Sequence, residues 1–118
     1  MQDDVITTVA NPGASGTVYL YDESQGGNGA DTTARDVRRV GVNIYADQVV
    51  TVFHEVQLPG GTVFRAVNGA GDATTANTLL DKDYVMKAGK NRIRIVSTTA
   101  PTVWECGGRL INQRPATT

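Results

Sequence analysis

The stretch from Val37 to Leu58 decides the fold, and it reads VRRVGVNIYADQVVTVFHEVQL. In its first half, Val37–Tyr45, apolar residues alternate with polar ones. In an extended chain, one face would carry the apolar side chains of Val40, Val42 and Ile44. This period of two is the signature of a β-strand that buries one face.

The second half of the stretch predicts another strand, Val49–Leu58. Ala46-Asp47-Gln48 separates the two halves as a tight corner. Beyond it, Val50, Val52 and His54 share one face, and the residues between them are mostly polar or aromatic. The two strands are therefore expected to fold back on each other.

The same reading extends along the rest of the chain. No window carries the i, i+3, i+4, i+7 apolar stripe of a helix, and β-branched residues dominate the apolar runs. Further strands are expected at Val5–Val9, Thr17–Tyr21, Thr62–Val67, Leu79–Met86, Asn91–Val96 and Val103–Ile111. Pro59-Gly60-Gly61 predicts a hairpin turn, and Gly107-Gly108 a bulge within the last strand.

This spacing of short strands predicts an all-β fold, an antiparallel β-sandwich of jelly-roll-like type with seven or eight short strands. Residues 1–118 are read as a single domain. Residues 1–16 are a possible N-terminal arm and 113–118 a flexible tail. Asp22–Asp31 and Asn68–Asn77 are predicted to be flexible loops, because Gly, Asp, Asn and Thr dominate them. The predicted core consists of Val40, Val42, Ile44, Val50, Val52, Ile93, Ile95 and Leu110.

Composition argues against several classes of function. The net charge is −1 and charged residues make up 19 % of the chain, whereas nucleic-acid-binding domains carry a basic excess. No apolar run approaches the length of a membrane helix. Met1–Asp4 has no basic region and no apolar run follows it, so no signal peptide is expected. We expect a protein made in a cytoplasm, with no nucleic-acid, membrane or small-molecule partner.

The residues that usually carry chemistry are sparse. Zinc sites need several Cys or His ligands, and the chain has one of each, Cys106 and His54. The carboxylates Asp22, Glu23, Asp31, Asp81 and Asp83 lack the spacing of a calcium-binding loop. No metal or cofactor is expected.

Catalysis is not expected either. His54 and Cys106 are read as buried structural side chains. Glu55 and Glu105 could in principle act as a pair of carboxylates in glycoside hydrolysis, but solvent-facing glutamates are common on strands. The sequence therefore predicts a protein that is not an enzyme and has no catalytic residues.

Two groups of basic residues could form one patch for a phosphate or an acidic protein if they were coplanar. The first group precedes the strongest strand, and the second surrounds the turn before the Arg-Ile-Arg strand. Their members are Arg35, Arg38 and Arg39, and Lys87, Lys90, Arg92 and Arg94.

Three segments carry a resemblance to a known family. They read RRVGVNIYADQVVTVFHEV, TVFRAVNG and DYVMKAGKNRIRIVSTTAPTVWECGGRL. Together they resemble small β-sandwich virion proteins of tailed bacteriophages, of the capsid decoration or cement type. The resemblance covers roughly residues 37–111 and lies in the order of strands and turns, including the Ala46-Asp47-Gln48 corner and the Trp104 that opens the last strand.

The resemblance implies a structural protein of the virion that binds the outside of the capsid shell and stabilises it. Its expected partners are the major capsid protein and further copies of itself, as a trimer. The two predicted loops and the N-terminal arm are expected to make the contacts, since loops and termini can order on binding. The candidate interface residues are Val5, Ile6, Val9, Arg35, Arg38, Arg39, Asn68 and Asp72.

Two alternatives remain open. One is a tail or head–tail accessory protein of a phage. The other is a carbohydrate-binding β-sandwich module, which would need two or three exposed aromatic rings on one face. The candidate rings are Tyr19, Tyr21, Tyr45, Tyr84 and Trp104.

Overall fold

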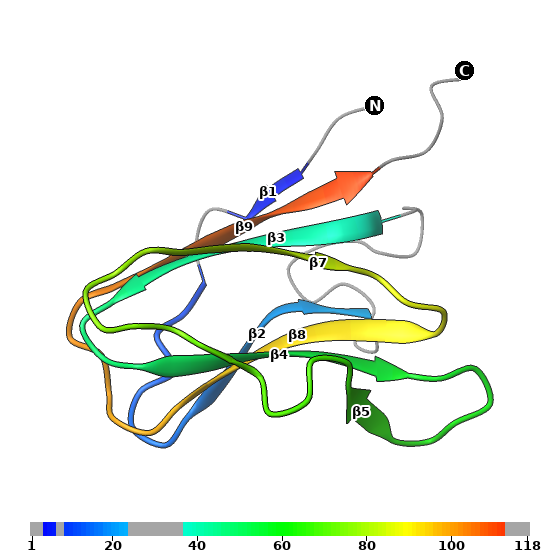
Figure 1. Cartoon of the computed structure of the whole chain (residues 1–118), viewed down its shortest axis with the longest axis horizontal. Coiled ribbons are helices and arrows are strands. Elements are labelled where there is room, and N and C mark those ends of the chain that lie inside the picture. Colours follow the sequence, from blue (N-terminus) through cyan, green and yellow to red (C-terminus); the bar gives the residue numbers. More distant parts are fainter. Residues whose placement is uncertain (1–3, 7–8, 24–36, 113–118) are drawn as a thin grey trace.

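The computed structural model describes residues 4–6, 9–23 and 37–112, and these residues contain nine β-strands and no α-helix. The strands form two antiparallel sheets that lie one above the other (Figure 1). Their bounds are β1 (Asp4–Ile6), β2 (Thr17–Asp22), β3 (Val37–Ala46), β4 (Val50–Gln57), β5 (Phe64–Ala66), β6 (Asp72–Ala73), β7 (Leu80–Val85), β8 (Lys90–Ser97) and β9 (Trp104–Asn112). The predicted all-β sandwich is confirmed.

The strand order makes the sandwich a jelly roll. Sheet A has the order β1-β9-β3-β7, and sheet B has the order β2-β8-β4-β5, with β6 also paired to β4. The first strand thus pairs with the last, the second with the last but one, and so on inward to β4 and β5. This nesting is what results when a long antiparallel ribbon folds over into two layers, as in jelly rolls.

The core lies between the sheets, where the alternating faces of β3, β4, β8 and β9 meet. All eight predicted core residues are confirmed as buried, with at most 1 % of their surface exposed: Val40, Val42, Ile44, Val50, Val52, Ile93, Ile95 and Leu110. Burying such side chains contributes roughly 1.5–3 kcal/mol each relative to exposure. Leu20 and Tyr84 extend the same cluster toward the sheet edges.

The bulge predicted at Gly107-Gly108 is wrong. The ladder between β3 and β9 runs through it without a break, with Val42 opposite Gly108 and Asn43 opposite Gly107. A Cβ atom on Gly108 would lie 2.5 Å from the backbone oxygen of Gly41. The glycine at position 108 therefore serves a close approach of two strands.

The segment Asn68–Asn77 is not the loose loop that its composition suggested. Two of its residues form β6 and pair with Thr51 and Val52 of β4. Thr74 is buried, and its hydroxyl accepts a hydrogen bond from the backbone N–H of Val50 at 3.0 Å. The prediction failed because short polar side chains can satisfy backbone groups as well as they can form turns.

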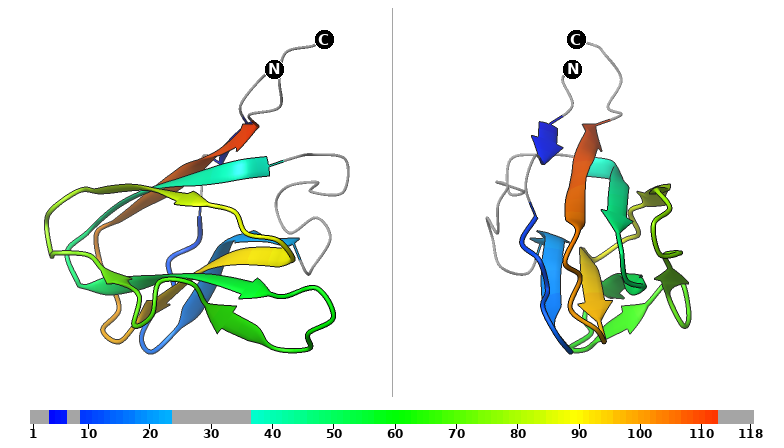
Figure 2. Two further views of the ribbon diagram at one scale, coloured as in Figure 1. Left: turned by 45° about the vertical axis from the view of Figure 1, so that its right-hand side comes forward. Right: turned by 90° about the vertical axis from the view of Figure 1, so that its left-hand side faces the viewer.

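The sandwich has two distinct ends. At the Asn112 end lie the end of β2, the start of β3, the turn from β4 to β5 and the end of β9. The ladder pairs at this end are Asp22 with Arg92, Gln57 with Lys90 and Val37 with Asn112. The Asp47 end holds the opposite turns, where Asp47 Oδ1 accepts the backbone N–H groups of Thr102 and Val103. The layers and both ends can be followed in Figure 2.

Candidate functional site

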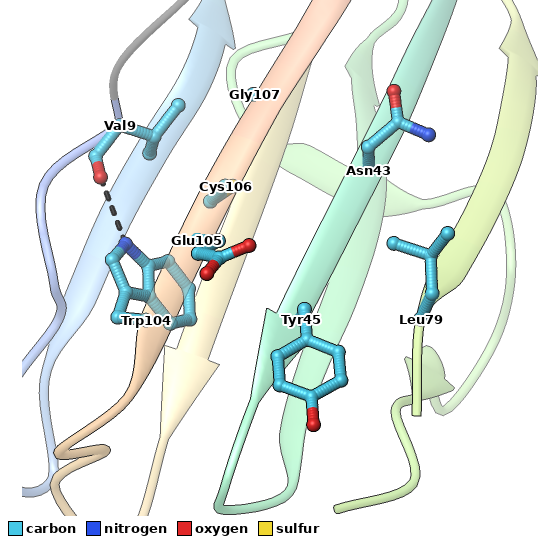
Figure 3. Close-up of a pocket in the computed structure, with 8 residues that line it drawn as sticks. All are labelled: Val9, Asn43, Tyr45, Leu79, Trp104, Glu105, Cys106 and Gly107. Atoms are coloured by element: carbon cyan, nitrogen blue, oxygen red, sulfur yellow. Dashed lines mark hydrogen bonds between the residues drawn. The ribbon is translucent and has the colours of Figure 1, made fainter. Parts of the chain in front are cut away.

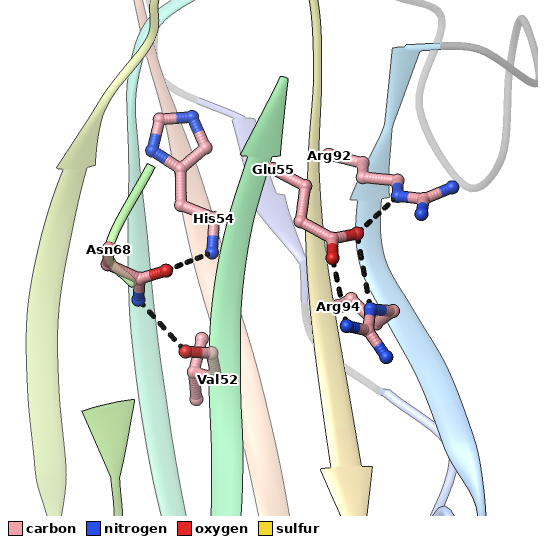
Figure 4. Close-up of polar contacts among 6 residues, drawn as sticks. All are labelled: Val52, His54, Glu55, Asn68, Arg92 and Arg94. Carbon is pink, nitrogen blue, oxygen red and sulfur yellow. Dashed lines mark hydrogen bonds and ion pairs between the residues drawn. The ribbon is translucent and has the colours of Figure 1, made fainter. Parts of the chain in front are cut away.

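The outer face of sheet B is closed by an ion-pair cluster. Glu55 of β4 accepts hydrogen bonds from Arg92 Nε at 2.7 Å and from Arg94 Nε and Nη2 at 3.1 and 2.8 Å (Figure 4). The two arginines cover the carboxylate so well that Glu55 is only 6 % exposed, although it lies on the side facing away from the core.

Aromatic rings complete this cluster. The guanidinium of Arg92 lies 3.9 Å from the ring centroid of Phe64, and that of Arg94 lies 4.6 Å from the ring of Phe53. Partial burial opposes ionisation of Glu55, but the hydrogen bonds from Arg94 and Arg92 outweigh it and lower the pKa of the carboxyl. The charges of Glu55 and both arginines are thus used inside the protein.

His54 takes part in a second internal network. It lies on the core side of β4, and its Nε2 is 2.9 Å from Asn91 Oδ1. The Asn91 amide nitrogen donates to Lys87 O and Glu23 Oε1, and its oxygen accepts the backbone N–H of Lys87. An amide oxygen can only accept, so the Nε2 of His54 that faces it carries the proton. Burial lowers the pKa of His54, which favours the neutral form.

The groups that catalysis would require do not meet. Glu55 lies on β4 of sheet B and Glu105 on β9 of sheet A, so the two carboxylates do not flank a common site. Cys106 is buried, which raises the pKa of its thiol to about 12. Over residues 4–6, 9–23 and 37–112, no group of three or more His, Cys, Asp or Glu side chains is placed to hold a metal ion.

The outer face of sheet A is different, because it is hollowed. A depression of about 500 Å³ opens over the ladder between β3 and β9, toward the Asp47 end (Figure 3). Its lining consists of Val9, Asn43, Tyr45, Leu79, Trp104, Glu105, Cys106 and Gly107. We call it the sheet A hollow.

Two features shape the sheet A hollow. Gly107 lies opposite Asn43 in the ladder and adds no side chain to the floor. At one wall, the indole Nε1 of Trp104 donates to the backbone oxygen of Val9 at 2.8 Å, which fixes the ring against the segment after β1. Tyr45 lies across the ladder from Glu105, and Figure 3 shows both beside the hollow.

Only two of the five candidate aromatic rings come together. Tyr21 and Tyr84 are buried, and their hydroxyls donate to Glu23 and Asp72. Tyr19 lies on sheet B under Arg92. Tyr45 and Trp104 both line the sheet A hollow, but from different sides of the sheet, because Trp104 lies opposite the buried Ala46 and packs against the core.

The predicted interface residues do not form one surface. Val5 of β1 is exposed opposite Arg109, Ile6 packs against the core, and Val9 is buried. Arg39 forms an ion pair with Asp83 of the neighbouring strand at 3.4 Å. Arg38 is exposed, and Arg35 lies outside the described residues.

Asn68 and Asp72 have structural roles. The amide of Asn68 bridges β4, because its oxygen accepts the N–H of His54 and its nitrogen donates to Val52 O (Figure 4). Asp72 Oδ2 accepts hydrogen bonds from Asn68 and from the Tyr84 hydroxyl and pairs with Lys82 at 3.0 Å. These bonds tie the segment both to β4 of sheet B and to β7 of sheet A.

The two groups of basic residues are not coplanar. Arg39 belongs to sheet A, whereas Arg92 and Arg94 belong to sheet B. The condition for one basic patch is therefore not met by these residues.

Sequence reasoning missed the sheet A hollow. Asn43, Leu79 and Gly107 line it, and none was singled out as a site residue. The available signal was the pair of glycines at odd positions, Gly41 and Gly107, on the solvent side of two adjacent strands. Without the register between β3 and β9, that signal could not be assembled.

Comparisons with known proteins give a likeness of fold. No protein-family model and no curated protein matches the sequence. Among solved structures, the crystal structure of the PBSX exported protein XepA superimposes with a TM-score of 0.68 at 15 % sequence identity. The likeness covers 99 % of this chain and 39 % of that one, so the chain spans well under half the length of XepA.

Residues 4–6, 9–23 and 37–112 contain no helix long and apolar enough to cross a membrane.

Proposed function

We propose that this chain is a non-enzymatic structural protein of a bacteriophage, and that it decorates the outside of the capsid shell as a cement protein. The observation that carries the proposal is the likeness in fold over 99 % of the chain to XepA, a protein of phage PBSX. The resemblance of residues 37–111 to phage decoration proteins points the same way.

The internal contacts support the non-enzymatic part of the proposal. His54, Glu55 and Cys106 are buried, and the first two are held by hydrogen bonds within the fold. A catalytic residue must instead reach a substrate with a free functional group. Such a chain acts through what it presents at its surface.

The Asn112 end is our candidate for the surface that contacts the shell. Three large aliphatic side chains lie exposed there, Leu58 and Val63 in the turn between β4 and β5 and Val85 at the end of β7. Exposed apolar side chains near one another are typical of protein contact sites. β2, which precedes the predicted contact loop Asp22–Asp31, also ends here; residues 24–31 of that loop lie outside the described residues.

The partners follow from this assignment. The major capsid protein supplies the docking surface, and many copies on a symmetric shell add avidity to a weak single contact. Self-association as a trimer is part of the proposal, because a closed ring covers contact surfaces without open growth. Light scattering of the purified chain measures this, and a strict monomer at high concentration would contradict the trimer.

The test uses particles purified from a phage that carries the gene, compared with particles from a deletion strain. We expect the protein in the particle fraction at a copy number set by the shell symmetry, with matching density on the shell in cryo-electron microscopy. Particles without it should release DNA at a lower temperature. Density on the tail would favour the accessory-protein alternative, and protein found only in the culture supernatant would refute the virion role.

A further inference from the structure

The lining of the sheet A hollow combines apolar side chains with polar ones. Tyr45, Trp104 and Leu79 give it apolar surface, and Glu105 and Asn43 give it polar groups. Its volume of about 500 Å³ falls in the usual range of small-molecule sites, roughly 300–1,000 Å³. Mostly apolar walls with a few convergent polar groups are the general mark of such sites.

The aromatic walls are positioned before any ligand arrives. The bond from Trp104 Nε1 to Val9 O holds the indole, and Tyr45 extends from the central strand β3. A ring that is already fixed loses little conformational entropy when a ligand stacks on it.

The polar groups have unused hydrogen-bonding capacity. Among the described residues, Glu105 has no hydrogen-bond or ion-pair partner, and it is exposed. Asn43 Nδ2 donates to Asp81 Oδ1 at 2.9 Å, which fixes the amide and leaves its oxygen to accept from a ligand. Together these groups offer several acceptors for hydroxyl donors.

The backbone beneath the hollow is paired on β3, which lies between β9 and β7. On β9, β1 pairs only with Gly108, Arg109 and Leu110, so among the described residues no strand covers the outer edge of β9 beside the hollow. A ligand that lies over Tyr45 and Asn43, on the face of the sheet, therefore binds side chains, because β3 has no unpaired edge for strand addition there.

The charges around the hollow indicate a neutral ligand. A second, more polar depression of about 360 Å³ continues from it and shares Asn43; its charged lining includes Arg39, Arg109, Asp81 and Asp83. With Glu105, that makes two positive and three negative groups, and Arg39 and Asp83 are paired with each other. A polyanion or a polycation would meet both signs along this path.

We propose that the sheet A hollow is a binding site for a neutral oligosaccharide. One sugar ring stacks against Tyr45, its hydroxyls donate to Glu105 and Asn43, and the chain continues into the second depression past Gly41. The sheet A hollow lies toward the Asp47 end, whereas the second depression reaches Arg39 and Ile111 beside the Asn112 end. A copy docked on a shell through the Asn112 end would therefore keep the hollow itself open.

The test is titration calorimetry, with backbone-amide NMR shifts, against neutral hexasaccharides of glucose, mannose, galactose and N-acetylglucosamine in both anomeric linkages. We expect at least one to bind, with shifts centred on Asn43 and Gly107 and weaker binding of the matching disaccharide. Tyr45→Ala should weaken binding about fivefold or more, since stacking on an aromatic ring is worth about 1 kcal/mol or more. Glu105→Gln should weaken it less.

Two controls separate a specific site from general effects. Tyr19→Ala removes a similarly half-buried tyrosine on the outer face of sheet B and should leave the affinity unchanged. Gly41→Ala adds a methyl group whose closest neighbour is Asp83 Oδ1, at 2.9 Å, with Arg109 at ordinary contact distance, and it should selectively weaken the hexasaccharide. The proposal is wrong if no member of the panel binds at millimolar concentration, or if Tyr45→Ala and Tyr19→Ala change the affinity equally.

Discussion

The outer faces of the two sheets are built from the same alternating pattern, yet they are finished in opposite ways. On sheet B, Glu55 draws Arg92 and Arg94 across the surface, and both arginines stack on phenylalanines. On sheet A, Gly107 leaves the floor bare and Glu105 projects without a partner among the described residues. On the outer face of sheet B these charged groups bond to one another, whereas on the outer face of sheet A the carboxylate of Glu105 stays available to a ligand.

The difference teaches where binding can occur in a small jelly roll. Both inner faces must bury aliphatic side chains, so they leave no freedom for function. An outer face can either reinforce the sheet by cross-strand pairs or present a site. In this protein the outer face of sheet B reinforces its own sheet and the outer face of sheet A presents a site. The proposed ligand site therefore lies over β3 and β9.

The largest expected effects are in the core that both sheets share. Ile44→Ala on sheet A and Ile93→Ala on sheet B should each cost about 2–5 kcal/mol of the free energy of unfolding, because each leaves a cavity at a fully buried position. Urea denaturation measures both. A loss below ~1 kcal/mol at either position would mean that the two sheets do not contribute equally to one core.

The next effect separates the outer faces. Glu55→Gln should cost ~1.5–3 kcal/mol, because it leaves two half-buried arginines without their anion. The matched change Glu105→Gln on sheet A should cost under ~0.5 kcal/mol, as exposed surface changes usually do. Equal losses in the two variants would contradict the distinction between a reinforced and an open face.

A smaller effect depends on pH and concerns His54. Its pKa is below the usual 6.5 because the ring is buried, so the unfolded chain binds a proton before the folded one does. Stability should therefore be constant above about pH 6.5 and fall as the pH drops below it, by at most ~1.4 kcal/mol per pH unit. Unfolding of wild type and His54→Gln between pH 7.5 and 5.5 measures this, and identical slopes would show that His54 is not the group responsible.

The fold was largely predictable because one physical signal dominated it. In Val37–Tyr45 and Asn91–Val96, period-two alternation fixed both the strands and the inward faces, and every predicted core residue is buried. The short strand β6 escaped because Asp72 and Ala73 carry no such alternation. Their pairing depends on hydrogen bonds from β4 to Asn68 and Thr74, which join residues far apart in the sequence.

The candidate site was much less predictable. Trp104 and Tyr45 were among the rings considered, but Tyr21 and Tyr84 looked equivalent to them and are buried. Glu55 and Glu105 looked equivalent as well, and what separates them is the position on β8 of Arg92, opposite Glu55, and of Arg94, opposite Phe53. Sites on a sheet face depend on which residues of distant strands lie opposite each other, whereas alternation within one strand gives only the face on which a residue lies.

The most direct test of the account is rebinding of the purified chain to phage particles that lack it. Wild type should saturate the particles at a fixed copy number. Leu58→Asp, at the Asn112 end, should abolish binding, whereas Val49→Asp, at the Asp47 end, should bind like wild type; the two side chains are matched in exposure, at 54 % and 50 %. Failure of the wild-type chain to bind, or equal binding by both variants, would contradict a decoration protein that docks through its Asn112 end.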